Sequence, residues 1–223
     1  MEKGFFLITG TSRGIGEALA LKLTNDGHTV LGVSRSQSKV LTSPNYHHHS
    51  FNLTETQRIG ELIEHAAELI STNEYDFLCL VSNASAVEPM DVVEKCAPDK
   101  IQSHINIGLV APMVLTSLFM GKFADFSGRK KIALMSSGAY NNPLWGHGVY
   151  CSAKAGISMF AQVAGLEQGN SGFEVLSIGP GMVDTSMQAA LHTKTKEQVA
   201  LIDFFNQAYA DGTLDSPAEV AEK

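Results

Sequence analysis

The stretch FFLITGTSRGIGEALALKL, residues 5–23, decides the fold of this chain. Residues 5–8 are an apolar run typical of a buried strand, and residues 17–23 place apolar side chains at helical spacing. Between them, Gly10, Gly14 and Gly16 follow the pattern Gly-x3-Gly-x-Gly. Such a turn lets the backbone approach an anion, and the following helix presents free N–H groups to it. A tight turn without a ligand would have a similar sequence, but the order strand, turn, helix favours a nucleotide phosphate site.

The alternation of strands and helices continues along the chain. Further strands are expected at residues 28–34, 46–51, 76–82, 131–135 and 173–178, and helices at 54–70, 98–123 and 150–166, with another starting near 217. This order predicts one α/β domain over residues 1–223, a Rossmann-type doubly wound parallel sheet in three α/β/α layers. Residues 187–210 have a mixed character that favours a lid over a substrate; a pair of surface helices is the alternative.

Composition indicates a globular chain and argues against two classes of partner. Of 223 residues, 44% are hydrophobic and 17% are charged, which suits one domain with a buried core. The net charge is −7 and no basic cluster stands out, so no nucleic-acid surface is expected. The longest apolar region, residues 105–120, contains Asn106 and Pro112 and is too short to span a membrane, so we expect a buried helix there.

Cysteine and histidine positions bear on location and metal binding. Cys79, Cys96 and Cys151 show no metal-ligand spacing, and the apolar run at residues 5–8 is too short for a signal peptide. We therefore expect a reduced, cytoplasmic protein. The histidines at residues 47–49 fall in an expected strand, where neighbouring side chains point to opposite faces, so no metal site is expected.

A second informative stretch is MSSGAYNNPLWGHGVYCSAK, residues 135–154. Tyr150 and Lys154 are four residues apart, so a helix beginning near Tyr150 puts both side chains on one face. A nearby ammonium group favours the phenolate and lowers the pKa of the phenol, which can then exchange a proton with a substrate oxygen. Ser137 follows an expected strand, where its hydroxyl can orient a carbonyl oxygen. Taken alone, the pair would be an ordinary Tyr and Lys on an amphipathic surface helix.

The ends of two other strands indicate a dinucleotide. Arg35 stands just beyond the strand at 28–34, where an acidic residue would bind the ribose 2′-hydroxyl of NAD. Together with Arg13 of the glycine turn it suits a 2′-phosphate instead, although either arginine singly resembles a solvated surface charge. Asn52 and Leu53 follow the third strand and are placed to flank an adenine ring.

Taken together, these motifs are similar to those of one family. They are Thr9-Gly10-x3-Gly14-x-Gly16, Asn83-Ala84, Asn106, Ser137, Tyr150-x3-Lys154 and Pro180-Gly181. Their order resembles the short-chain dehydrogenase/reductase family, and the resemblance covers the whole chain. The stretch PGMVDTSMQ at 180–188 and the run from Trp145 to Cys151 resemble the sepiapterin-reductase-like branch, which includes bacterial benzil reductases. Residues 111–117 are especially similar to the benzil reductases.

The resemblance implies four catalytic roles. Tyr150 would be the proton donor, and Lys154 would lower its pKa and hold the nicotinamide ribose. Ser137 would orient the substrate carbonyl. Asn106 would hold a proton-relay water through a distorted helix; a core Asn that satisfies a backbone carbonyl is the other interpretation.

The resemblance also implies a binding surface for NADP(H). The expected cofactor residues are Gly10, Ser12, Arg13, Gly14, Ile15, Gly16, Arg35, Asn52, Leu53, Asn83, Ala84, Tyr150, Lys154, Pro180, Gly181, Val183 and Thr185. Among them, Val183 and Thr185 would contact the nicotinamide carboxamide. A homo-oligomer, either a dimer or a tetramer, is expected.

Two departures from the family pattern stand out. The family's Asn-Ala-Gly is Asn83-Ala84-Ser85 here, so the backbone beside the adenosine is expected to differ slightly. No segment after the helix near residue 217 matches the last edge strand that the family normally has, so that strand is expected to be missing. The acid that anchors pterin in sepiapterin reductases lies in that segment, so pterin specificity does not carry over.

The combined reading is an NADPH-dependent carbonyl reductase that acts on a small-molecule substrate, with Tyr150 as proton donor. The alternatives are an alcohol dehydrogenase that uses the same site and a non-catalytic NADP(H)-binding sensor on the same fold. The joint presence of Asn106, Ser137, Tyr150 and Lys154 favours an enzyme.

The expected substrate pocket contains no cation. Its residues are Ser137, Trp145, Tyr150, Met182 and Met187. Neither Arg nor Lys occurs between residues 131 and 150, and the first one after residue 180 is Lys194, so an anionic substrate is disfavoured. A flat, neutral aromatic ketone or α-diketone such as benzil suits these side chains. The alternative for Trp145 is a subunit contact.

Overall fold

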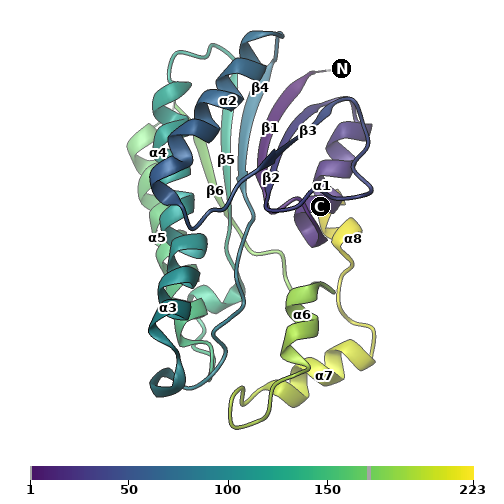
Figure 1. Cartoon of the computed structure of the whole chain (residues 1–223), viewed down its shortest axis with the longest axis vertical. Coiled ribbons are helices and arrows are strands. Elements are labelled where there is room, and N and C mark those ends of the chain that lie inside the picture. Colours follow the sequence, from purple (N-terminus) through teal and green to yellow (C-terminus); the bar gives the residue numbers. More distant parts are fainter. Residues whose placement is uncertain (1, 170–171) are drawn as a thin grey trace.

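A six-stranded parallel sheet in the order β3-β2-β1-β4-β5-β6 forms the centre of the computed structural model, which describes residues 2–169 and 172–223 (Figure 1). The strands are β1 (Gly4–Thr9), β2 (Thr29–Ser34), β3 (Tyr46–Ser50), β4 (Phe77–Ser82), β5 (Arg129–Met135) and β6 (Glu174–Ile178). The helices are α1 (Gly14–Asn25), α2 (Ile59–Ser71), α3 (Pro98–Ile105), α4 (Ala111–Lys122), α5 (Gly148–Gln168), α6 (Ser186–Leu191), α7 (Ile202–Ala210) and α8 (Pro217–Glu222). The predicted doubly wound sheet is confirmed.

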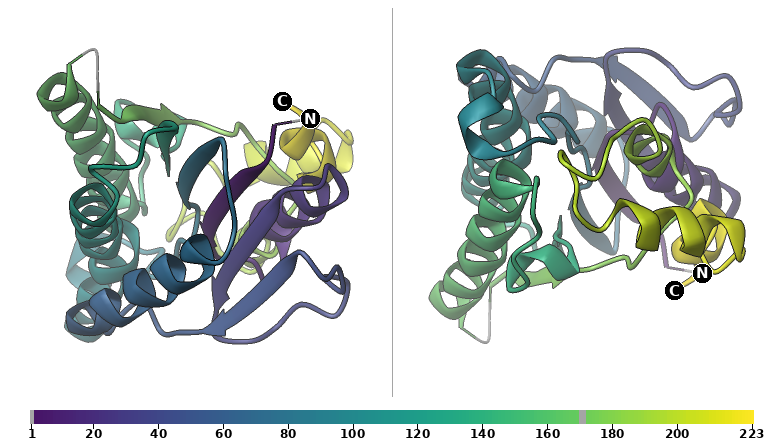
Figure 2. Two further views of the ribbon diagram at one scale, coloured as in Figure 1. Left: turned by 90° about the horizontal axis from the view of Figure 1, so that it is seen from above. Right: turned by 90° about the horizontal axis from the view of Figure 1, so that it is seen from below.

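Helices cover both faces of the sheet, as alternation along the strands requires. In β1, Leu7 faces a core built with α2, α4 and α5, whereas Ile8 faces a second core that includes Ala20 of α1. Figures 1 and 2 show α2, α4 and α5 on one side of the sheet and α1 with α8 on the other. The three-layer arrangement is therefore the predicted one.

Two helices begin at other residues than the sequence suggests. The helix expected from residue 54 begins at Ile59, after a 3-10 turn at Thr56–Arg58, because the Asn52 side chain accepts from the Thr54 amide at 3.2 Å and forms a turn instead. The helix α5 begins two residues earlier than expected. β6 lies at the edge of the sheet, and no strand within the described residues pairs with its outer side.

Residues 98–122 form a helical segment of 25 residues that is long and apolar enough to cross a membrane by those two criteria. The apolar region expected at residues 105–120 is thus part of a longer helical segment that meets them. The segment is nevertheless a core helix, because Ala111, Leu115 and Phe119 are fully buried against the sheet, and α4 contacts α2 and α5. The predicted burial is confirmed for the face of α4 that packs on the sheet.

Candidate active site

The glycine turn after β1 has the backbone geometry that an anion site requires. Gly10 and Gly14 adopt φ values of +79° and +64°, a region that favours glycine. A Cβ at Gly16 would lie 2.4 Å from the Gly10 carbonyl oxygen and 2.5 Å from the Asn83 side-chain nitrogen. No side chain caps the start of α1, so its first N–H groups remain free for a ligand. The residues fit a dinucleotide pyrophosphate.

The end of β4 is fastened to the end of β1. The Thr9 hydroxyl accepts from the backbone amides of Asn83 and Ala84, both at 3.0 Å. The Asn83 side-chain nitrogen donates to the Thr9 carbonyl at 3.0 Å. Asn83 therefore shapes the floor of the glycine turn through its side chain, and Ser85 directly follows this fixed pair.

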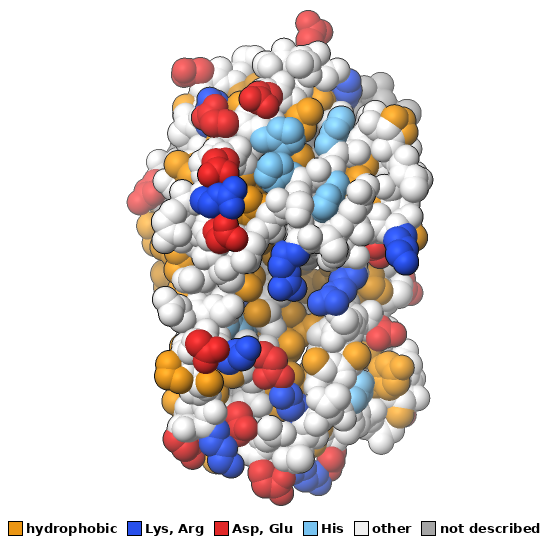
Figure 3. Space-filling model, viewed as in Figure 1, with side chains coloured by type: hydrophobic (Ala, Val, Ile, Leu, Met, Phe, Trp, Pro, Cys, Tyr) orange, Lys and Arg blue, Asp and Glu red, His pale blue; other side chains and the backbone are white. Residues whose placement is uncertain are grey.

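Two exposed arginines stand at the expected adenosine end. Arg35 follows β2, and Arg13 precedes α1. Within residues 2–169 and 172–223 neither forms an ion pair with a carboxylate, although the other two arginines, Arg58 and Arg129, do. Figure 3 shows basic side chains at the rim of a hollow across the middle of this face. Leu53 is buried and Asn52 is half-buried nearby after β3.

The segment after β6 is brought back to the glycine turn. The Asp184 amide donates to the Asp215 carbonyl at 2.9 Å, and the Asp215 amide donates to the Met182 carbonyl at 3.1 Å. These contacts bury Val183 and carry the chain to Thr185, whose methyl group would lie 3.4 Å from a Cβ on Gly14. Pro180 and Gly181 begin this segment, and Gly181 has a φ of +84°.

Tyr150 and Lys154 lie one turn apart near the start of α5. The Lys154 ammonium is buried, donates to the Met135 carbonyl at 2.8 Å and lies 5.5 Å from the centroid of the Tyr150 ring. Ser137 follows β5, and its hydroxyl accepts from the Ala139 amide at 3.3 Å. The end of β5 is held by Ser136, whose amide donates to the Ile178 carbonyl at 2.7 Å. These contacts bring together the Ser137 hydroxyl, the Tyr150 phenol and the Lys154 ammonium.

Burial has the largest effect on the pKa values of Tyr150 and Lys154. It raises the pKa of Tyr150, while hydrogen bonding with the Ser137 hydroxyl acts in the opposite direction. Burial lowers the pKa of Lys154 to about 8. For Tyr150 the net direction is upward, because burial of the phenol outweighs other influences, and the Lys154 ammonium donates to the Met135 carbonyl. The role of Lys154 in lowering the pKa of Tyr150 stays a prediction.

The helix is distorted where the sequence suggested. Residues Asn106–Val110 form a π turn, and the Ala111 amide donates to the Asn106 carbonyl five residues back. Such π turns occur often at functional sites. The role of Asn106 in holding a relay water stays a prediction.

Two histidines lie beside Tyr150, and of these His104 was missed in the sequence. His104 and His147 are buried, and their ring centroids lie 6.0 and 6.2 Å from that of Tyr150, both in edge-on geometry. His104 stands two residues before Asn106, directly before the apolar region that begins at residue 105, a signal that could have been used. His147 lies in the loop before α5.

The lid, defined here as residues 186–210, comprises α6, α7 and the segment between them. Seen from below in Figure 2, it lies across the carboxyl ends of the strands, as a lid would. Met182 is 37% exposed, and Met187 is half-buried at the start of α6. Trp145 is 61% exposed, and its indole nitrogen donates to the Glu197 carbonyl at 3.3 Å. Trp145 therefore lies at the outer rim, against the lid, whereas Ser137 and Tyr150 lie deeper.

Comparison with known proteins points to one family. Residues 5–196 match the family model described as short chain dehydrogenase. Two benzil reductases ((S)-benzoin forming), from Bacillus cereus and Bacillus subtilis (strain 168), are 35% and 34% identical, covering 98% and 97% of this chain and 91% and 89% of theirs. A sepiapterin reductase from Meriones unguiculatus is 28% identical over 97% of this chain and 88% of its own. The crystal structure of the KRED1-Pglu enzyme shares the fold, with a TM-score of 0.84, 24% identity and coverage of 98% of this chain and 91% of that one.

Proposed function

The chain belongs to the short-chain dehydrogenase family, and on that premise we propose that it is an NADPH-dependent carbonyl reductase. The observation that carries the proposal is the grouping of Ser137, Tyr150 and Lys154 at the carboxyl end of β5. These side chains come from a strand end and a helix start, so rigid elements hold them. A non-catalytic sensor would need no such group.

The three residues can divide the reaction between them. When bound, the nicotinamide cofactor supplies the hydride that reduces the carbonyl carbon. The Ser137 hydroxyl holds the carbonyl oxygen, and the Tyr150 phenol gives that oxygen its proton. Lys154 places a positive charge beside the phenol, which favours loss of the proton as negative charge develops.

The ionisation of Tyr150 favours reduction over the alternative of alcohol oxidation. Because burial raises the pKa of this phenol, it carries its proton at neutral pH. A proton donor must start in that state, whereas a base that oxidises an alcohol must start as phenolate. The site is therefore better prepared for reduction.

The arginines support NADPH over NADH. Arg13 and Arg35 carry free, exposed guanidinium groups on either side of the expected ribose position, and neither is neutralised by a carboxylate among the described residues. A 2′-phosphate would accept charge-assisted hydrogen bonds from such groups.

The substrate side supports a neutral aromatic ketone or α-diketone. Lys194, the first cation after residue 180, is occupied by the Glu88 carboxylate at 2.6 Å and is therefore unsuited to an anionic substrate. The benzil reductases similar to this chain act, by their names, on an aromatic diketone. We propose a benzil-like compound that is reduced at one carbonyl.

The outer surface of α4 and α5 supports a proposal of self-association. Five large apolar side chains there are exposed, from 38% to 82%: Met113, Leu118, Met159, Val163 and Leu166. Exposed apolar patches on helices often mark a subunit contact. We propose that a second copy of the chain covers them.

We also propose that the protein works in the cytoplasm. Its three cysteines are free thiols, as a reducing compartment would keep them.

The test is NADPH consumption by the purified protein. The panel compares benzil-like diketones, small aliphatic ketones and anionic keto acids, each with NADPH and with NADH. We expect the highest catalytic efficiency with diketones and NADPH. Higher efficiency with keto acids would contradict the substrate class, equal use of both cofactors would contradict the cofactor, and no consumption with any carbonyl compound would contradict the function.

A further inference from the structure

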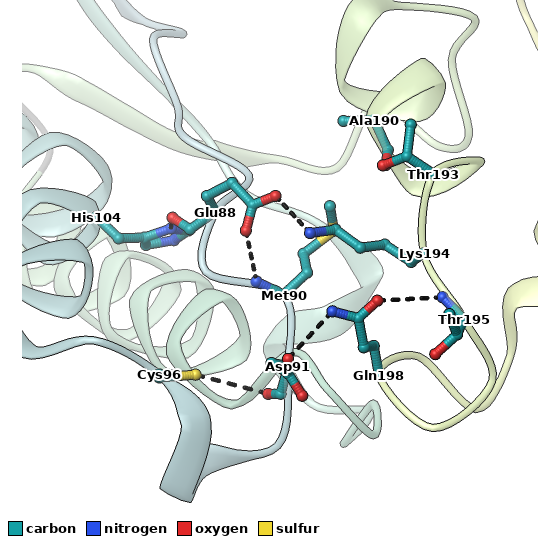
Figure 4. A network of polar contacts seen from close by, with 10 residues as sticks. All are labelled: Glu88, Met90, Asp91, Cys96, His104, Ala190, Thr193, Lys194, Thr195 and Gln198. Carbon is teal, nitrogen blue, oxygen red and sulfur yellow. Dashed lines mark hydrogen bonds and ion pairs between the residues drawn. The ribbon is translucent and has the colours of Figure 1, made fainter.

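A cluster of polar contacts joins the lid to the loop after β4, defined here as residues 83–97 and called the β4 loop (Figure 4). Lys194 forms an ion pair with Glu88 at 2.6 Å, and its side chain is only 14% exposed. The Gln198 side chain donates to the Asp91 carboxylate at 3.1 Å. Apolar side chains of both segments pack beside these contacts: Met90, Leu191, Val199 and Ile202 are buried together. The lid is therefore docked on this loop by charge and by apolar contact.

Glu88 also faces away from the lid. Its second carboxylate oxygen accepts from the Met90 amide at 3.0 Å, which fixes the side chain against its own loop. Its backbone carbonyl lies 2.8 Å from Nδ1 of His104 in α3, as Figure 4 shows. A carbonyl only accepts hydrogen bonds, so Nδ1 carries the proton. Glu88 thus contacts the lid through its side chain and His104, which lies beside Tyr150, through its backbone carbonyl.

His104 is enclosed between that carbonyl and Tyr150. Its ring is 1% exposed and meets the Tyr150 ring edge-on, with an interplanar angle of 82°. Its Nε2 has no hydrogen-bond partner within residues 2–169 and 172–223. Burial lowers the pKa of His104, so its ring stays neutral close to Lys154. A buried ring tethered at one nitrogen restricts the orientations open to the phenol beside it.

We propose that His104 is a positioning residue for Tyr150 and that Glu88 links it to the lid, so that lid docking and orientation of the proton donor are coupled. The inference rests on the proposed reductase function and deepens it. When Lys194 holds Glu88, the Glu88 carbonyl fixes His104, and His104 confines the Tyr150 ring. When the lid leaves, the β4 loop loses its charged partner, and the phenol gains freedom. Chemistry is then fastest in the covered site, where water is excluded.

The test uses substitutions at both ends of this chain of contacts. Lys194→Gln removes the ion pair and keeps a side chain of similar length. Lys196→Gln is the matched control, because Lys196 is exposed in the same segment and pairs with Asp203 inside the lid. His104→Phe keeps a ring against Tyr150 and loses the tether. His104→Asn keeps a donor for the Glu88 carbonyl and loses the ring, so either variant carries the test if the other does not fold.

The expected result is a separation of kcat from KM. Both His104 variants should lower kcat by a factor on the order of 10, and Lys194→Gln by about 3, with KM for NADPH changed less than about twofold. Coupled contacts are not additive, so Lys194→Gln combined with His104→Phe should be no slower than His104→Phe alone. Coupling is reciprocal, so His104→Phe should also speed hydrogen exchange in residues 186–210, a readout that needs no turnover. Lys196→Gln should match the native protein in kcat.

Several results would overturn the inference. They are a native kcat in either folded His104 variant, effects that multiply in the double variant, a lid whose hydrogen exchange ignores His104, or equal effects of Lys194→Gln and Lys196→Gln. Failure of the proposed function looks different: the native protein would then reduce no carbonyl compound, while the hydrogen-exchange comparison would still report whether His104 and the lid are linked.

Discussion

The cofactor side and the substrate side of this cleft are built in different ways. On the cofactor side, backbone conformation shapes the site. The turn contains glycines with positive φ, and the close approach at Gly16 leaves no room for a side chain. On the substrate side, single side-chain contacts such as Glu88 with Lys194 join segments about a hundred residues apart. The first side is therefore intolerant of small changes, and the second can be adjusted one contact at a time.

The largest effect should come where the two sides meet. Tyr150→Phe removes the proton donor and keeps the ring, so kcat should fall by a factor on the order of 10² or more, with NADPH affinity largely kept. Steady-state rates with a diketone and titration of NADPH fluorescence measure the two quantities. Tyr75→Phe, at the opposite end of β4, is the control. Near-native turnover in Tyr150→Phe would remove the central claim.

A single methyl group should break the cofactor side. In Gly16→Ala the new Cβ meets the Gly10 backbone at 2.4 Å, and backbone cannot swing aside. We expect NADPH affinity to fall at least roughly tenfold, or about 1.4 kcal/mol, with a lower melting temperature. Gly60→Ala is the control, since nothing lies within 4 Å of that position in α2. Unchanged NADPH binding in Gly16→Ala would show that the turn is not the phosphate site.

A charge reversal should separate the two cofactors. Arg35→Glu places a carboxylate near the expected 2′-phosphate, so KM for NADPH should rise by a factor on the order of 10, while KM for NADH should fall or stay constant. Lys100→Glu, on the exposed face of α3, makes the same change in net charge and should alter neither value. If KM rises equally for NADPH and NADH in Arg35→Glu, Arg35 does not bind the 2′-phosphate.

The pH dependence should reflect the buried ammonium. Burial lowers the pKa of Lys154 to about 8, so its charge is present below that pH and is lost above it. In the proposed mechanism reduction needs this charge and a protonated Tyr150, so kcat at saturating NADPH should decline several-fold as pH rises through about 8. A rate that stays constant well above that pH would mean that the Lys154 charge does not contribute to the step.

The smallest effect should come from the rim of the substrate side. Trp145 is 61% exposed and held by one hydrogen bond to the lid. Trp145→Ala should therefore raise KM for a diketone only about threefold and leave kcat nearly unchanged. A loss of tenfold or more would place the indole against the substrate itself. No change at all would assign Trp145 to a contact outside the pocket.

The sequence by itself determined the sheet, its order of elements and the positions of the cofactor turn, Ser137, Tyr150 and Lys154. These follow from local rules: strand and helix periods, glycine in turns and the spacing of two side chains on one helix face. Boundaries were less certain where a side chain competed with the backbone, as Asn52 did before α2.

Only the tertiary structure decided the surroundings of those residues. The burial that raises the pKa of Tyr150, the Met135 carbonyl that binds Lys154, and the link from Lys194 through Glu88 to His104 all depend on segments that are distant in the chain. Desolvation and hydrogen bonding act over a few ångströms. The sequence alone does not show which distant residues come that close in space. For that reason the candidate catalytic residues could be read from the sequence, while the contacts that set their ionisation and orientation could not.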